Sequence, residues 1–311
     1  MKKLLIFLLL PCLLAGCAFS ENDAEISEGY TFTDSAGDSV TVPYKPQKVA
    51  VLTSSLADLW ITAGGSVDIT VYETVERGFV TENVVLVDDG AGKTVNTELL
   101  VASKPDFVLY STELSGQIAC AETLKNAGIA VAGFDVSTFD DYLNLLKICT
   151  DILQTPDKYE EYGTKLQNEI NDIITRAKNE EHTPSILFVR AGSSAKYTKA
   201  KTKENHFVCV MLDDIGTYNI AEKATVLLDG LSIEEILISD PDAILFTTMG
   251  DEESGRAYME SLVNDPLWQK LSAVKNNKVY QLPKELFQYK PNSRWKEAYS
   301  YLIGLLYGDI I

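Results

Sequence analysis

A cluster of basic residues stands out in the second half of the chain. Positions 190 to 203 carry no acidic residue. They hold Tyr197 and five cationic side chains, namely Arg190, Lys196, Lys199, Lys201 and Lys203. Guanidinium and ammonium groups bind carboxylates and other anionic oxygens, and a phenol adds a hydrogen-bond donor, a stacking face or a ligand for iron. The cluster fits two interpretations equally, a wall for an anionic ligand or a lysine-rich loop in solvent.

Further candidates follow other expected strands. Open α/β sheets bind ligands beyond the carboxyl ends of their strands, so the loops after the strands are the places to search. In the first half these loops offer Ser54, Ser55, Tyr72, Arg77 and Tyr110. A loop before the last expected helix adds Tyr289, Lys290 and Arg294, whereas Trp295 is expected to pack within that helix. We expect the residues of both halves to face one cleft.

Two histidines limit the chemistry that the chain can perform. His182 is expected to be exposed at a polar helix end. His206 fits a surface or capping role, with ligation of haem iron by His206 or Tyr197 as the alternative. No Ser/His/Asp arrangement can be proposed, so no covalent chemistry is expected. Bare zinc or manganese needs several histidines and carboxylates close together, so any metal is expected to arrive already chelated.

Length and composition describe a folded, acidic protein. The 311 residues suffice for one large or two medium domains. A hydrophobic content of 46% with 23% charged residues excludes extended disorder and a protein with many membrane spans. The 27 Lys and Arg against 45 Asp and Glu give a net charge of -18, which argues against nucleic acid as a partner.

The first residues have the pattern of a lipoprotein signal peptide. Lys2 and Lys3 precede an apolar run, Leu4–Leu14, that is too short to span a bilayer. The run ends in Leu14-Ala15-Gly16-Cys17, which resembles the bacterial lipobox. The resemblance implies removal of residues 1–16 and attachment of acyl chains, such as palmitate, to Cys17. Loss of the two lysines changes the net charge from -18 to -20. We expect a protein anchored at the extracytoplasmic face of a bacterial membrane.

Three cysteines remain once Cys12 is removed with the signal peptide and Cys17 is acylated. Cys120, Cys149 and Cys209 are an odd, widely spaced set. This favours buried free thiols, with a Cys120–Cys149 bridge as the alternative. Residues 17–29 are polar without periodicity and are expected to form a flexible tether.

The rest of the chain alternates between short apolar runs and helical segments. Residues 30–43 have the alternation of a β-hairpin. Strands are then expected at Lys48–Leu52, Asp68–Tyr72, Phe107–Tyr110, Ala130–Phe134, Ser185–Arg190, Ala243–Thr247 and Lys278–Leu282. Helices are expected from Leu56, at Thr97–Ser103 and Ser115–Ala127, from Val208, and at Ser254–Val263 and Ser293–Tyr307. The alternation indicates βα units around mostly parallel sheets.

One long helix separates the two sets of βα units. Thr155 is expected to cap it and Pro156 to occupy its first turn, and apolar residues recur at helical spacing to about Asn179. The predicted fold is therefore α/β, with two Rossmann-like lobes joined by one backbone helix. The expected boundaries are an N-terminal lobe at 30–152, a connecting helix at 153–180 and a C-terminal lobe at 181–311.

Several motifs occur in the order and spacing of a known family. Thr33-Asp34-Ser35-Ala36-Gly37 is followed by Asn96-Thr97-Glu98-Leu99-Leu100 and Lys104-Pro105-Asp106. The second half repeats this pattern with Ser232-Ile233-Glu234-Glu235 and Asp240-Pro241-Asp242, and then has Asp265-Pro266-Leu267-Trp268. Over nearly all of the chain after Cys17, the sequence resembles the class III solute-binding proteins of ABC importers.

The resemblance implies a function and several partners. Members capture iron–siderophore complexes, haem or cobalamin between two lobes and deliver them to a permease with a cytoplasmic ATPase. The ligand is cargo, so no intrinsic cofactor is expected, and the protein is expected to be a monomer that closes modestly on binding. Glu98 and Glu234 match the glutamates that pair with permease arginines, with Glu235 as the alternative to Glu234. The basic candidates favour an iron(III)–siderophore complex, with haem second and a corrinoid third. An exported enzyme acting on its bound chelate is the other class considered.

Overall fold

A β-hairpin begins the part of the chain that the computed structural model describes, which comprises residues 29–81, 83–88 and 94–308. Strands β1 (Gly29–Thr33) and β2 (Ser39–Pro43) pair antiparallel, as the alternation predicted. The turn between them contains Gly37 at φ 86°, a left-handed conformation that glycine adopts at little cost. Cys17, the signal peptide and nearly all of the predicted tether lie outside the described residues.

The N-terminal lobe is built on five parallel strands in the order β5-β4-β3-β6-β7. The strands are β3 (Val49–Val51), β4 (Ile69–Thr70), β5 (Val85–Leu86), β6 (Phe107–Ser111) and β7 (Ala130–Phe134). The helices are α1 (Ser54–Thr62), α2 (Tyr72–Glu76), α3 (Thr97–Ser103), α4 (Ser115–Asn126) and α5 (Phe139–Leu153). One expectation was wrong in detail, because Tyr72 begins helix α2 and does not end a strand.

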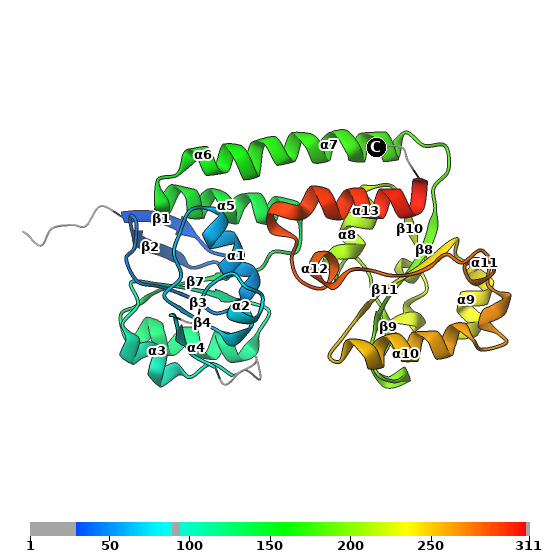
Figure 1. Cartoon of the computed structure of the whole chain (residues 1–311), viewed down its shortest axis with the longest axis horizontal. Coiled ribbons are helices and arrows are strands. Elements are labelled where there is room, and N and C mark those ends of the chain that lie inside the picture. Colours follow the sequence, from blue (N-terminus) through cyan, green and yellow to red (C-terminus); the bar gives the residue numbers. More distant parts are fainter. Residues whose placement is uncertain (1–28, 82, 89–93, 309–311) are drawn as a thin grey trace, which may run out of the picture.

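A long helical segment then leads to the second lobe, as predicted (Figure 1). It consists of α6 (Pro156–Tyr159), a π-helical turn at Glu160–Thr164 and α7 (Lys165–Lys178). Pro156 occupies the first turn, where its missing N–H costs no hydrogen bond. The predicted cap was wrong in its chemistry. The Thr155 hydroxyl makes no capping hydrogen bond and donates instead to the Ala63 carbonyl oxygen at 2.7 Å, which ties this helix to the end of α1.

The C-terminal lobe repeats the design with parallel strands in the order β10-β8-β11-β12, and β9 pairs antiparallel with β8. The strands are β8 (Ser185–Ala191), β9 (Lys199–Ala200), β10 (Tyr218–Asn219), β11 (Ala243–Thr248) and β12 (Val279–Gln281). The helices are α8 (Phe207–Asp214), α9 (Ile233–Ser239), α10 (Glu252–Val263), α11 (Ser272–Lys275), α12 (Lys284–Phe287) and α13 (Trp295–Tyr307). Five short 3₁₀ turns lie between them, at Ala195–Tyr197, Ile220–Glu222, Thr225–Leu228, Trp268–Lys270 and Asn292–Arg294.

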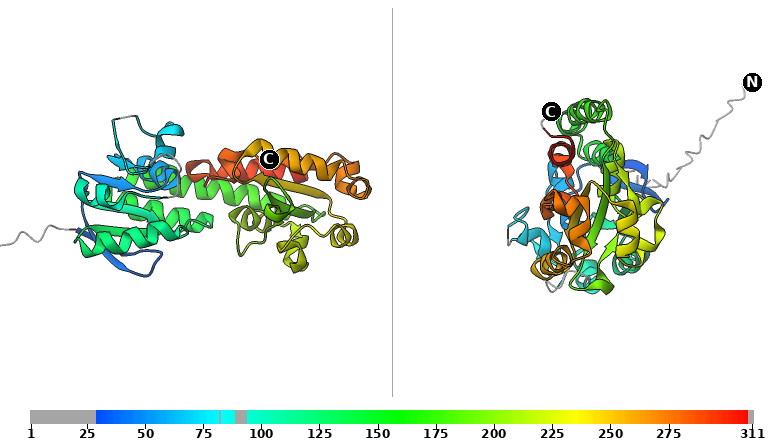
Figure 2. Two further views of the ribbon diagram at one scale, coloured as in Figure 1. Left: turned by 90° about the horizontal axis from the view of Figure 1, so that it is seen from below. Right: turned by 90° about the vertical axis from the view of Figure 1, so that its right-hand side faces the viewer.

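The two lobes lie side by side along the longest axis, and helices α5, α7 and α13 cover the same side of both (Figures 1 and 2). After α12 the chain returns toward the first lobe, where the Asn292 side chain donates to the Ser55 carbonyl oxygen at 2.8 Å. Trp295, which is 1% exposed, packs edge-on against Phe139 of α5 and Phe207 of α8. The expected packing role of Trp295 is confirmed, and this aromatic contact joins the cores of the two lobes.

Cys120, Cys149 and Cys209 are buried free thiols, so the alternative Cys120–Cys149 bridge does not form. Burial raises the pKa of the Cys149 thiol well above its ordinary value. These cysteines therefore act as small apolar core residues. Within the described residues, no helix has the length and apolar character needed to cross a membrane.

Candidate ligand-binding cleft

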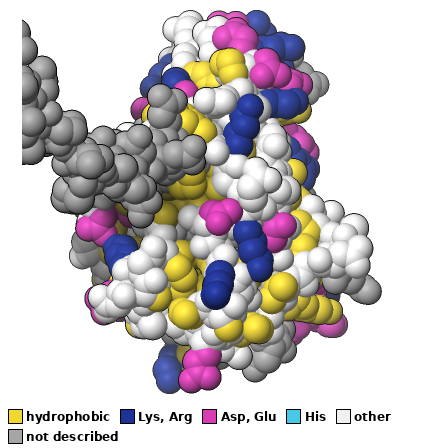
Figure 3. Space-filling view, turned by 90° about the vertical axis from the view of Figure 1, so that its left-hand side faces the viewer, with side chains coloured by type: hydrophobic (Ala, Val, Ile, Leu, Met, Phe, Trp, Pro, Cys, Tyr) yellow, Lys and Arg dark blue, Asp and Glu magenta, His cyan; other side chains and the backbone are white. Residues whose placement is uncertain are grey.

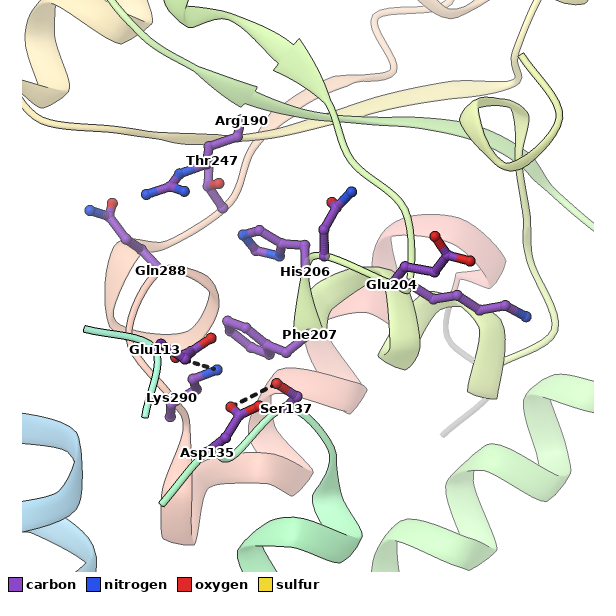
Figure 4. A pocket seen from close by; sticks show the side chains of 12 residues that line it. Glu113, Asp135, Ser137, Arg190, Glu204, His206, Phe207, Thr247, Gln288 and Lys290 are labelled. Carbon is purple, nitrogen blue, oxygen red and sulfur yellow. Dashed lines mark hydrogen bonds and ion pairs between the residues drawn. The ribbon is translucent and has the colours of Figure 1, made fainter. Parts of the chain in front are cut away.

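A cavity of about 330 Å³ opens between the two lobes (Figure 4). Both lobes line it, together with the segment that returns after α12. The lining residues are Glu113, Asp135, Ser137, Arg190, Lys203, Glu204, Asn205, His206, Phe207, Thr247, Gln288 and Lys290. The residues from the two sheets lie at or just beyond the carboxyl ends of their strands, which is where ligands of open α/β sheets bind.

The C-terminal wall of the cavity is cationic. Arg190 and Thr247 are register partners near the ends of β8 and β11, so both side chains reach the cavity from neighbouring strands. Lys290 enters from the segment after α12. Lys201 lies close behind, and burial together with Arg190 and Lys199 lowers its pKa. The positive charges of this wall come from three separate segments of the chain.

His206 lies at the centre of this wall. It is the N-cap of α8, and its Nδ1 accepts a hydrogen bond from the Val208 backbone N–H at 3.3 Å. The ring packs beside Phe188 and Phe207, with centroids 4.7 and 5.3 Å away. Burial, reinforced by the positive charges of Arg190, Lys290 and Lys201, lowers the pKa of His206 to about 3. The expected capping role is confirmed, and the same side chain also lines the cavity.

The N-terminal wall is acidic, which the sequence analysis missed. Glu113 and Asp135 follow β6 and β7, and Ser137 donates from Oγ to Asp135 Oδ1 at 2.9 Å. Glu113 faces Lys290 across the cleft, with 3.8 Å between Oε2 and Nζ. The residues predicted from the sequence were basic, tyrosine and serine side chains near the carboxyl ends of strands. The same positional rule applies to the acidic residues after β6 and β7.

A second, more apolar cavity of about 170 Å³ adjoins the first. Glu113, Gln288 and Lys290 line both. The remaining lining residues are Thr53, Ser55, Leu56, Ser111, Leu114, Phe134, Val136, Tyr289 and Asn292. The predicted candidates Ser55 and Tyr289 lie here. The cleft therefore has a charged compartment lined by both lobes and a mostly apolar one lined mainly by the N-terminal lobe.

Arg77 makes a contact between the lobes and does not line either cavity. Its guanidinium lies 3.8 Å from the centre of the Tyr289 ring and 4.6 Å from that of Phe79. Nη1 donates to Ser54 Oγ at 2.9 Å, and Ser54 in turn donates to Glu73. The Arg77 side chain is only 8% exposed. These contacts use the groups of Ser54 and Arg77 that we expected to meet a ligand.

The other predicted ligand residues lie away from both cavities. Tyr110 is 3% exposed and packs over Gly133 within the sheet, and Tyr72 is exposed. Lys196 is exposed and lies over the exposed ring of Tyr197, while Lys199 and Lys201 are half-buried. Arg294 forms a two-pronged ion pair with Glu297 at 2.7 and 2.8 Å. Of the basic cluster, Arg190 and Lys203 reach the cavity.

Within the residues that the structure describes, no group of three or more histidine, cysteine or acidic side chains could hold a metal ion. The cavity instead offers hydrogen-bond donors and charges of both signs. Such a lining suits a polar, charged ligand.

Two parallel-sheet lobes with a cavity at the carboxyl ends of their strands define a substrate-binding protein. A model of the periplasmic binding protein family matches residues 49–286. The chain belongs to this family. Its members are substrate-binding components of ABC importers.

Relatives and solved structures agree with this assignment. The Fe(3+)-citrate-binding protein YfmC of Bacillus subtilis (strain 168) is 24% identical over 288 residues, which cover 89% of this chain and 88% of the relative. The putative ABC transporter substrate-binding lipoprotein YhfQ of the same organism is 24% identical over 313 residues, or 93% of each chain. The crystal structure of a periplasmic solute binding protein from Veillonella parvula shares the fold, with a TM-score of 0.69, 20% identity, and coverage of 91% of this chain and 88% of that chain.

Proposed function

We propose that this protein is an extracytoplasmic lipoprotein that captures an iron(III) chelate with anionic oxygens and delivers it to an ABC permease. The convergence of Arg190 and Lys290 on the cavity, with Lys201 close behind Arg190, carries the proposal. Cations that are partly removed from water bind carboxylate, hydroxamate or catecholate oxygens strongly, since charge-assisted hydrogen bonds are about twice as strong as neutral ones. The similarity to a ferric-citrate-binding protein supports the same ligand class.

The arrangement of the cavity supports binding without turnover. His206 is the histidine that lines the cavity. Its Nδ1 is occupied in capping a helix, and its pKa is strongly lowered. His206 is therefore unsuited to act as a general base for a nucleophile at neutral pH. Ser137 donates to Asp135 and makes no hydrogen bond to a histidine. We therefore assign the chain a transport role and no catalytic one.

Glu98 and Glu234 are the residues that we assign to the permease contact. Each is exposed in the first turn of its helix, α3 or α9, whereas the alternative Glu235 is half-buried. Both helices end in a left-handed residue followed by Pro-Asp, at Lys104 and Asp240. The two glutamates thus occupy equivalent places on the two lobes, as a permease with two similar halves would require.

The Pro-Asp turns have the same structural role in both lobes. Asp106 accepts from the backbone N–H of Lys48 at 2.8 Å, and Asp242 accepts from that of Ser185 at 2.8 Å. Each aspartate thereby fixes the start of the first strand of its lobe's parallel sheet, β3 or β8. Figure 3 shows basic and acidic side chains interspersed over the outer end of the N-terminal lobe, so the net charge does not form one patch on this face.

Membrane attachment through Cys17 completes the proposal. The lipobox-like sequence and the similarity to a substrate-binding lipoprotein support it. The segment from Cys17 to the start of β1 would act as a tether that keeps a monomeric binding protein near its permease.

A titration of intrinsic fluorescence tests the ligand class. The chain has 15 tyrosines and 3 tryptophans. The lipid-free protein is titrated separately with ferric citrate, a panel of ferric siderophores, haemin and cobalamin. We expect saturable quenching by an iron chelate at micromolar concentration or below. Binding of haemin or cobalamin alone would assign the ligand to the alternative class, and binding of none would overturn the proposal.

A matched pair of variants locates the site in the same experiment. Arg190→Gln removes a cation that lines the cavity, and we expect affinity for the chelate to fall about tenfold or more. Lys196→Gln removes an exposed cation of the same cluster and should leave affinity unchanged. Equal effects of the two changes would contradict the assignment of the cavity as the binding site.

A further inference from the structure

The hydrogen bond at the start of α8 determines which nitrogen of His206 carries a proton. Nδ1 accepts from the Val208 backbone N–H at 3.3 Å. A ring nitrogen that accepts a hydrogen bond must keep its lone pair, so Nδ1 is unprotonated. The proton of the neutral ring then resides on Nε2.

The surroundings of His206 keep the ring neutral. Arg190 at the end of β8, Lys201 after β9 and Lys290 after α12 all oppose a further positive charge. Of the acidic groups on the cavity, Glu113 is paired with Lys290, and Asp135 and Glu204 also line it. Phe188 and Phe207 lie against the ring. A second proton would also have to sit on Nδ1, which would break the helix cap.

The protonated edge of the ring is directed into the cleft. Figure 4 shows the imidazole pointing into the cavity between Arg190, Gln288 and Phe207. Nε2 lies on the side of the ring away from Nδ1 and the helix. Among the described residues Nε2 has no hydrogen-bond acceptor, whereas Nδ1 has its donor.

This geometry is the reverse of that of a metal-ligating histidine. Such a histidine binds the metal through an unprotonated nitrogen and donates its other N–H to a protein acceptor. In His206 the unprotonated nitrogen is turned to the helix and occupied, and the protonated one faces the ligand space. Iron ligation by His206 would require the loss of both the cap and the proton.

We infer that His206 is a fixed, neutral hydrogen-bond donor that selects a ligand with an anionic oxygen opposite Nε2, and that it does not ligate iron. The inference rests on the proposed function, because it concerns the same cavity. It assigns a specificity-determining residue and predicts that this contact does not change with pH across the neutral range.

The tautomer is measured first, on the unliganded wild-type protein. Long-range proton–nitrogen NMR spectra distinguish the two ring nitrogens, and the sequence has only His206 and the exposed His182 to assign. We expect an unprotonated Nδ1 and a protonated Nε2 in His206, unchanged from pH 5 to pH 8. A proton on Nδ1, or titration within that range, would overturn the inference whatever the ligand is.

The donor role is measured with His206→Asn. Asparagine is a preferred N-cap residue, so its side-chain oxygen replaces Nδ1 in capping α8. Its amide nitrogen also donates, but the shorter side chain does not carry this donor to the position of Nε2 in the cleft. We expect the variant to stay folded, with a melting temperature lowered by the lost ring packing against Phe188 and Phe207, and affinity for ferric citrate measured below that temperature to fall about tenfold or more. Unchanged affinity would overturn the donor role.

Absorption spectra separate hydrogen bonding from ligation. The visible spectra of ferric citrate and of haemin, each bound to wild type or to His206→Asn, should have the same maxima, because the iron keeps its ligands. A shifted maximum in the variant would show that His206 ligates iron. If ferric citrate does not bind wild type, the ferric siderophore that binds in the fluorescence titration replaces it as the probe. If no iron chelate binds, the proposed ligand class fails, and the NMR result still decides the state of His206.

Discussion

Asp58 is a half-buried carboxyl group on α1 that faces the returning segment of the chain. Its Oδ2 accepts from the Asn292 side chain at 2.8 Å. Burial raises the pKa of Asp58, and the hydrogen bond from Asn292 with the charges of Arg77 and Arg294 offsets only part of this effect. Because the pKa is higher in the folded protein, folding binds protons here. The stabilising effect of the proton is complete below the carboxyl pKa of the unfolded chain and is lost as pH rises through the folded pKa.

The variant Asp58→Asn tests this linkage. The amide oxygen can still accept from Asn292, and the variant avoids burial of a charge. We expect a higher melting temperature than wild type at pH 7, with a difference that shrinks steadily as pH is lowered toward about 3, where the unfolded carboxyl is also protonated. Thermal unfolding followed by circular dichroism between these limits measures it. A difference that is independent of pH would contradict the explanation.

The guanidinium of Arg77 contacts Tyr289 and Ser54 and so joins the lobes. Because the side chain is largely shielded from water, these interactions are stronger than at the surface. The variant Arg77→Met keeps much of the side-chain volume but removes the cation over Tyr289 and the hydrogen bond to Ser54. We expect a loss of about 2–4 kcal/mol in the free energy of unfolding. Arg256→Met removes an exposed pair with Glu260 and should cost less than about 1 kcal/mol. Chemical denaturation measures both, and equal losses would contradict a stabilising role for Arg77.

The contacts of individual side chains could not be predicted from the sequence. Arg77, Tyr110 and Tyr289 were all predicted to face the cleft because they lie at or after the ends of expected strands or before the last helix, but only Tyr289 lines a cavity. The sequence does not show which neighbour satisfies each group. Arg77 is held by Ser54 and two aromatic rings, and Tyr110 covers a glycine on the next strand.

At the scale of elements, the contact between Tyr110 and Gly133 explains why that tyrosine is buried. The two residues are register partners on β6 and β7. A Cβ atom at Gly133 would lie 2.6 Å from the Cζ and hydroxyl oxygen of Tyr110. Since Tyr110 is only 3% exposed, its ring has little space to move away.

We therefore expect Gly133→Ala to destabilise the protein by about 1–3 kcal/mol through overpacking. Gly304→Ala is the matched control. Gly304 lies in α13 with no atom within 4 Å of an added Cβ, so this change should stabilise the protein by about 0.5–1 kcal/mol. Both values follow from denaturant unfolding. A neutral Gly133→Ala would show that the ring can relocate and that the close contact is not a constraint.

The regular elements were predictable because their signals are local. Alternation predicted the hairpin, and apolar runs predicted the strands β3, β6, β7, β8 and β11 within one or two residues. The π-helical turn was not predictable, because helical spacing continues through it. One tertiary contact reaches the turn, since Tyr142 donates to the Tyr162 carbonyl oxygen at 2.9 Å.

At the scale of the whole molecule, the cleft could be predicted in place but not in composition. Its lining comes from the ends of strands in both sheets, from the start of α8 and from the segment after α12. Sequence alone gives the strands, but the returning segment places Gln288 and Lys290 between the lobes through a packing arrangement with no local signature. The equivalent places of Glu98 and Glu234 on the two lobes were easier to predict, because each depends on one helix and one Pro-Asp turn.

The two glutamates lead to a prediction that separates capture from delivery. Glu98 and Glu234 are exposed on different lobes, and neither lines the cavity. The double change Glu98→Lys and Glu234→Lys reverses both charges without altering the lining. We expect it to abolish uptake of ferric citrate by cells that carry the permease, because each lysine would face a permease arginine. The affinity of the isolated protein for ferric citrate should stay within about twofold of wild type, because the altered side chains lie outside the cavity.

A control with the same change in net charge tests whether position matters. Glu160→Lys and Glu180→Lys alter exposed glutamates in the π-helical turn and just after α7, away from α3 and α9. Since this pair leaves both proposed docking positions intact, uptake should remain near the wild-type rate. Equal loss of uptake in the two double variants would indicate a general effect of charge. Loss of ferric citrate binding in the Glu98 and Glu234 variant would instead place these residues in the function of the cleft and contradict their assignment to docking.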